Sequence, residues 1–141
     1  MRKAISLFCV MIMICSMTPV YADDAVPAST NIGSLGAAIC HDNGCIVGEV
    51  SGSFTGEGLH AMYISNIQYW EDDLGDWVNV DSGRVFRTYT PGDIDLNVLY
   101  YWSPVVGTEY RLHVFMKVVD TDGNVWDASV VNSSSFVYPG P

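Results

Sequence analysis

The chain has 141 residues, of which 49% are hydrophobic and 16% charged, and its formal net charge at pH 7 is −10. A charge of this sign repels nucleic acid and anionic lipid, so we expect neither as a partner. The acidic balance instead suits solubility, a cationic partner or a divalent cation.

The first 22 residues have the pattern of a secretion signal. Arg2 and Lys3 give a positive start, and an apolar run of 14 residues extends from Ala4 to Met17. Val20 and Ala22 occupy the −3 and −1 positions of a cleavage site. The run is short for a membrane span, which needs about 20 residues. We therefore expect secretion after cleavage at Ala22, leaving a chain without a membrane span and with a net charge of −12, from four basic and 16 acidic residues.

The remaining 119 residues are sufficient for one domain with its own core. Residues 23–31 are mostly polar and are expected to form a flexible lead-in, and residues 32–138 to form the domain. Short extended segments alternate there with turn residues, and no segment has a helical pattern. The expected strands, in chain order, span 32–40, 45–54, 59–70, 77–80, 84–90, 94–102, 109–119 and 125–138.

Two of these strands contain irregularities in their sequence. In the second, Gly48 and Gly52 weaken the strand or mark a bulge. In the third, the apolar side chains change parity, which predicts a β-bulge near Ser65–Asn66. By contrast, apolar residues alternate cleanly from Ile94 to Trp102.

The clearest feature is a hairpin between residues 107 and 131. Its first strand places five apolar side chains on one face, at Tyr110, Leu112, Val114, Met116 and Val118. The turn contains Asp122-Gly123, and Gly123 can adopt the positive φ that a tight turn needs. These patterns together predict an all-β fold, a single antiparallel β-sandwich of about seven or eight strands.

Parts of the chain resemble fibronectin type III domains. Residues 107–114 and 119–124 are similar to the F strand and F–G turn of that family, and residues 67–77 are similar to its C strand and the tryptophan that follows. The resemblance implies a fibronectin type III-like or immunoglobulin-like sandwich in which Tyr110 makes the corner where the chain crosses between the sheets.

This resemblance has two departures. Residues 103–106 (SPVV) replace the usual Leu-x-Pro of the family, and no tryptophan lies between Cys45 and Phe54. The chain also resembles small secreted sandwich proteins of Gram-positive bacteria. A shared fold does not by itself assign a function.

Cys40 and Cys45 are the two cysteines outside the expected signal. In an exported chain, two cysteines most simply form a disulfide. A two-residue turn at Asn43-Gly44 would place Cys45 opposite Asp42, whereas a four-residue loop over 41–44 would place the cysteines opposite each other. We favour the four-residue loop and the disulfide. A metal site that includes His41 is the alternative, although it lacks a fourth ligand.

The acidic turns contain the ligand types of a calcium site. Asp120, Asp122, Asn124 and Asp127 cluster around one turn, and hard cations bind several oxygen ligands. However, the glycine stands at the fourth place of residues 120–124 (DTDGN) and not at the sixth, so an EF-hand loop does not fit. Hairpin formation also explains this composition, so we expect no cofactor and keep calcium as the alternative.

The aromatic residues are the other candidate for a binding surface. Strand alternation cannot bury all of them, and we expect Trp70, Trp77, Tyr101 and Trp126 to face outward. Exposed aromatic side chains stack on sugar rings or anchor protein partners.

No catalytic motif is found, since His41, His60 and His113 lie in no recognised catalytic context. The sequence therefore predicts a secreted, monomeric, non-enzymatic module that binds an extracellular protein or glycan through loops or exposed aromatic residues. A protease inhibitor that presents residues 103–108 or 55–58 is the alternative, as is a calcium-dependent adhesion domain.

Overall fold

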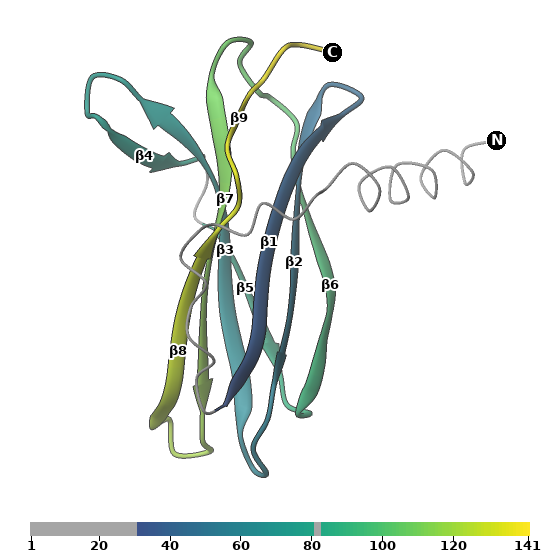
Figure 1. Cartoon of the computed structure of the whole chain (residues 1–141), viewed down its shortest axis with the longest axis vertical. Coiled ribbons are helices and arrows are strands. Elements are labelled where there is room, and N and C mark those ends of the chain that lie inside the picture. Colours follow the sequence, from purple (N-terminus) through teal and green to yellow (C-terminus); the bar gives the residue numbers. More distant parts are fainter. Residues whose placement is uncertain (1–30, 81–82) are drawn as a thin grey trace, which may run out of the picture.

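The computed structural model describes residues 31–80 and 83–141, in which strands are joined by turns (Figure 1). The expected signal and nearly all of the lead-in lie outside these residues. The described strands are β1 (Ile32–Asp42), β2 (Cys45–Phe54), β3 (His60–Glu71), β4 (Asp76–Asn79), β5 (Arg84–Thr88), β6 (Gly92–Tyr101), β7 (Glu109–Val119), β8 (Val125–Asn132) and β9 (Phe136–Val137). No helix in these two ranges is long and apolar enough to cross a membrane.

The strands form two antiparallel sheets that pack face to face (Figure 1). Sheet A has the order β1-β2-β6. Sheet B has the order β4-β3-β7-β8, with β5 paired to β3 and β9 paired to β7. β5 pairs with the first half of β3 and β4 with its second half, so two short strands share one edge of β3. The predicted all-β sandwich is confirmed.

The core lies between the sheets and is built from alternate residues of each strand. In β7 the five apolar residues at even positions from Tyr110 to Val118 are all buried, as the alternation predicts. From sheet A, Ile46, Val50 and Phe54 of β2 have no exposed surface. Burying each such side chain contributes about 1.5–3 kcal/mol relative to leaving it in water, so these two strands define the centre of the fold.

The bulge predicted in the third strand is wrong. β3 pairs with β7 in an unbroken register from His60↔Val119 to Tyr69↔Tyr110. The odd-numbered residues Tyr63 and Ile67 face the core, while Ile64 on the outer face is only half-buried. The apparent change of parity arises because β3 carries apolar side chains on both of its faces.

The four-residue loop predicted between the cysteines is also wrong. β1 pairs with β2 through Asp42↔Cys45, and Asn43 and Gly44 form a two-residue turn with φ values of 48° and 79°. Both values lie in the left-handed region that asparagine and glycine tolerate best, as in a type I′ hairpin turn. In this register Cys40 is paired with Val47, so the predicted disulfide between Cys40 and Cys45 is not formed.

Candidate functional site

The connection between β6 and β7, residues 102–108, carries the chain from sheet A to sheet B; we call it the β6–β7 loop. Tyr110, at the start of β7, anchors this loop to the core. Its side chain is buried, and its hydroxyl accepts a hydrogen bond of 2.9 Å from the backbone N–H of Val105. A tyrosine that bonds back to the backbone a few residues upstream is the corner geometry that the fibronectin type III resemblance implies.

Backbone hydrogen bonds fix the rest of the loop. The N–H of Thr108 donates to the carbonyl of Val105 at 3.2 Å, and the N–H of Gly107 donates to the carbonyl of Tyr138 at 2.9 Å. The N–H of Tyr138 donates in return to the carbonyl of Thr108 at 2.9 Å. The hydrogen bonds to the C-terminal segment therefore fix the conformation of the loop. Because the loop is already ordered, binding a partner costs it little conformational entropy.

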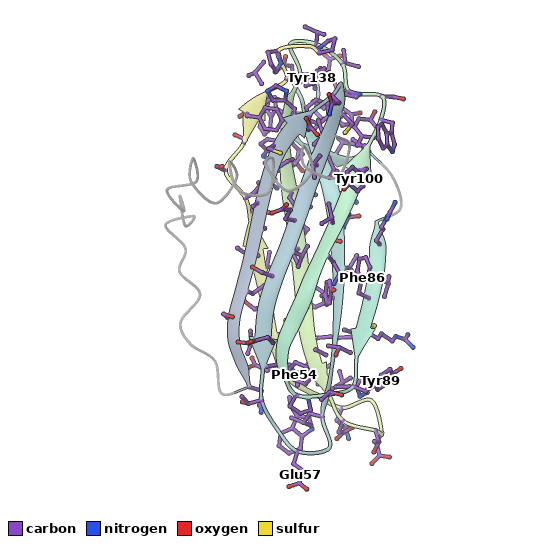
Figure 2. All side chains as sticks on the ribbon, turned by 90° about the vertical axis from the view of Figure 1, so that its right-hand side faces the viewer. Phe54, Glu57, Phe86, Tyr89, Tyr100 and Tyr138 are labelled. Atoms are coloured by element: carbon purple, nitrogen blue, oxygen red, sulfur yellow. The ribbon has the colours of Figure 1, made fainter. Side chains whose placement is uncertain are left out.

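The β6–β7 loop presents large apolar side chains to solvent. Trp102 is 69% exposed, Val105 60% and Val106 63%. The Trp102 ring stacks on Tyr100, the last outward-facing residue of β6, with ring centroids 5.7 Å apart and planes 17° apart. Figure 2 shows Tyr100 in the upper part of the molecule, on the same side as Tyr138 and far from Glu57. This end thus carries exposed aromatic and aliphatic side chains.

Tyr101 does not face outward as predicted. It is half-buried against the core, with its ring 6.0 Å from Tyr110, and burial raises the pKa of its hydroxyl. The reason is a bulge in β6. Val50 of β2 pairs with Asn97 of β6, whereas Gly52, two residues along β2, pairs with Ile94, three residues along β6. β6 therefore has one residue more than β2 in this interval, which exchanges the two faces of the strand beyond it.

Trp70 and Trp77 lie on the outer face of sheet B, where β3 pairs with β4. Their rings meet edge to face at 5.6 Å, and the Arg111 guanidinium lies over Trp77 at 4.3 Å from the ring centroid. The indole N–H of Trp70 donates to Asp72 at 3.0 Å. Both indoles are half-buried, and this cluster with Arg111 is not apparent from the sequence, because Arg111 is 34 positions away from Trp77.

Trp126 is 61% exposed at the opposite end, beside the β7–β8 turn. Its indole N–H donates to Asp120 at 3.0 Å, and Asn124 donates to Asp120 through both its side chain and its backbone, each at 2.9 Å. The donors on Asn124 and Trp126 lower the pKa of Asp120 to about 2. Gly123 in this turn has a φ of 87°, which favours glycine.

The four residues considered for calcium do not converge on one point. Both carboxylate oxygens of Asp120 accept hydrogen bonds inside the turn. Asp127 instead accepts bonds of 3.0 Å from the backbone N–H groups of Asn31 and Ile32, which attach the start of β1 to β8. Among the described residues, no group of three or more His, Cys, Asp or Glu side chains is arranged to hold a metal ion, the set around Cys40 and His41 included.

The Cys45 thiol donates to the carbonyl of Asp42 at 3.0 Å within the β1–β2 turn, and burial raises its pKa. His41 stacks on Phe136 and meets the edge of Tyr138. These contacts give both side chains a structural role.

Comparison with known proteins adds no family. A scan against protein-family models gives no match to this chain, and a search of curated proteins gives none either.

Proposed function

We propose that the protein is a secreted, non-enzymatic binding module that recognises an extracellular protein through the β6–β7 loop. The observation that supports this is the exposure of Trp102, Val105 and Val106 on a segment that hydrogen bonds to Tyr110 and Tyr138 hold in place. Covering apolar surface is favourable by roughly 25 cal/mol per Å². Since the loop is already ordered, little of that gain is lost to conformational entropy.

A protein partner fits this surface better than a glycan does. Sugars stack on aromatic faces, whereas Val105 and Val106 offer aliphatic surface of the kind that fills pockets in protein interfaces. A glycan remains the alternative that the stacked pair of Tyr100 and Trp102 favours. A loop-presenting protease inhibitor would use residues 103–108 of the same loop. The two-sheet fold is compatible with a fibronectin type III-like or immunoglobulin-like module, but the proposal depends on the loop and not on that likeness.

The test is a binding screen of the biotinylated protein, beginning at Asp23, on an array of extracellular protein domains and on a glycan array. Each hit is measured again with Trp102→Ala and with Val106→Asp. Val125→Asp is the matched control, because Val125 is 56% exposed at the start of β8, beside the β7–β8 turn, and undergoes the same chemical change. Thermal unfolding of every variant shows that the fold is retained.

We expect protein hits whose affinity falls at least tenfold in both loop variants and is unchanged in the control. Hits on the glycan array alone, lost with Trp102→Ala and kept with Val106→Asp, would replace the protein partner with a sugar. Protein hits that survive both loop substitutions would refute the role of the loop. Inhibition of a protease that Val106→Asp abolishes would select the inhibitor alternative.

A further inference from the structure

The outer face of sheet B carries an apolar row that crosses four strands. The register pairs Ile64 of β3 with Val85 of β5 and with Phe115 of β7, and Phe115 with Val130 of β8. Cross-strand partners point to the same face of a sheet, so the four side chains are neighbours in one line. Val85 is 56% exposed and Val130 43%, while Ile64 and Phe115 are half-buried.

This row is unusual for its position. The outer faces of sandwich sheets normally alternate with the core face and carry polar side chains. Contiguous exposed apolar surface that is bordered by polar groups commonly marks an interaction site. The row is separate from the β6–β7 loop, which leaves sheet A at the end of β6.

Positive charge gathers on the same face. Arg87 and Lys117 both pair with Met62, so they flank one side of the apolar row. Arg111 projects from β7 on the other side, two outward-facing positions beyond Phe115. These are three of the four Lys and Arg residues after Lys3, in a chain whose net charge is −10. The face therefore attracts negative charge, although the molecule as a whole repels it.

Arg111 is positioned to hold a carboxylate. Its guanidinium lies 4.3 Å from the centroid of Trp77, and its Nε donates to Gln68 at 2.8 Å. The Gln68 side chain donates in turn to Asn79 at 2.9 Å. In the described part of the chain no carboxylate forms an ion pair with Arg111 and no acceptor binds its two terminal nitrogens. A planar guanidinium held in this way offers a fork of donors that matches a carboxylate.

Asp76, at the start of β4, interacts electrostatically with Arg111 without forming an ion pair with it. Glu109, at the start of β7, already accepts a hydrogen bond from the Ser135 hydroxyl. His113 lies between Arg111 and Phe115, and its Nδ1 is 2.7 Å from the side-chain oxygen of Asn132. The face therefore combines a line of aliphatic and aromatic side chains with cations on both sides.

A second copy of this chain does not fit the face. Two such faces packed on each other would bring their cations together, and the copies also repel one another through their net negative charge. An extended polypeptide with alternating acidic and apolar side chains is complementary to both features. Its carboxylates would match Arg111, Arg87 and Lys117, and its apolar side chains would cover the row.

We propose that the outer face of sheet B docks an acidic polypeptide segment of a partner protein, with Arg111 binding a carboxylate and the row of Val85, Ile64, Phe115 and Val130 binding apolar side chains. This surface is distinct from the β6–β7 loop. A module with both surfaces would join two protein partners.

The test is an NMR titration of the ¹⁵N-labelled protein, beginning at Asp23, with three blocked pentapeptides. The probe alternates glutamate and leucine, and the two comparison peptides replace either glutamate with lysine or leucine with serine. We expect the probe alone to shift the amide signals of β3, β5, β7 and β8 progressively, with an affinity that weakens as salt is added. The double variant Arg87→Glu/Lys117→Glu and the variant Arg111→Gln should each weaken binding at least fivefold.

Arg84→Glu is the matched control, because Arg84 pairs with Ser65 and so points to the opposite face of β5. Val106→Asp, on the loop, should also leave binding unchanged. The proposal is overturned if the probe causes no shifts, if the shifts gather on residues 102–108, or if Arg84→Glu weakens binding as much as Arg87→Glu does alone. Shifts that depend on protein concentration without peptide would assign the face to a second copy instead.

Discussion

The hydroxyl of Tyr110 offers the sharpest test of how the β6–β7 loop is held. Tyr110→Phe removes one oxygen from a side chain that is only 2% exposed and leaves its ring in the core. The lost contact is the 2.9 Å hydrogen bond from the Val105 N–H. In the variant this donor has no partner where the phenol was, so the change affects the loop and the fold together.

The magnitude follows from the burial of this contact. A hydrogen bond contributes a net 0.5–1.5 kcal/mol, and a buried donor left without a partner costs about 1–3 kcal/mol. Because Val105 itself is largely exposed, water reaches part of its surroundings, and we expect a loss of about 1.5 kcal/mol in the free energy of unfolding. With an unfolding entropy of about 2.1 cal/mol/K per residue, that loss corresponds to a Tm lower by roughly 6 °C.

The assay combines calorimetry with amide hydrogen exchange, and Tyr138→Phe is its control. Tyr138 is equally buried, but its hydroxyl has no hydrogen-bond partner among the described residues, so its loss should change Tm by less than about 2 °C. The amide of Val105 should exchange about tenfold faster in Tyr110→Phe, because 1.4 kcal/mol is a factor of ten. Equal Tm values for the two variants, with unchanged exchange at Val105, would refute the corner.

Five further outcomes test the turns. The pKa of Asp120 is depressed, so its contribution to stability is complete above about pH 4 and is lost as the pH falls through about 2. Asp120→Asn should therefore reduce the fall of Tm between these two pH values. Asn124→Ala should raise the pKa of Asp120 in an NMR titration, because it removes a side-chain donor. Gly123→Ala places a Cβ at a φ of 87° and should cost about 1 kcal/mol in urea unfolding, whereas an unchanged midpoint would contradict the turn geometry. A reductant should leave Tm unchanged, and a lower Tm would show that Cys40 and Cys45 do form a disulfide. Millimolar calcium should not raise Tm, because the oxygens of Asp120 and Asp127 already accept hydrogen bonds; a rise of several degrees would show a site.

Local patterns were sufficient to predict much of the fold. The β7–β8 hairpin follows from strict alternation and an Asp-Gly turn, both of which are signals contained in a few neighbouring residues. The β1–β2 turn differs from the prediction because the turn preference of Asn43-Gly44 outweighs the tendency of the two cysteines to pair. The strand register excludes the four-residue loop. Asp42 pairs with Cys45, and the other nine residues of β2 pair with residues that precede Asp42 in β1.

The outward aromatic residues could not be assigned from their own strand. From Ile94 to Trp102 the alternation is regular, and no glycine or proline within this segment indicates an extra residue. The signal lies in the partner strand, at Gly52, where a Cβ would stand 2.9 Å from the Ser34 carbonyl oxygen and 3.3 Å from Ile94. A glycine that permits such close approach is a recognised mark of a bulge, but only the pairing of β2 with β6 shows which strand contains the additional residue.

The bulge in β6 determines which residues form the candidate recognition surface. Without the extra residue, Tyr101 would project outward, and Tyr100 and Trp102 would point towards the core. With it, Tyr101 packs against Tyr110, the residue whose hydroxyl holds Val105, while Tyr100 and Trp102 stack in solvent beside the same loop. The same register shift thus determines both the packing of Tyr101 on Tyr110 and the exposure of Tyr100 and Trp102. A deletion within residues 95–96 should therefore disturb the core and the binding surface together, whereas Trp102→Ala should affect binding alone.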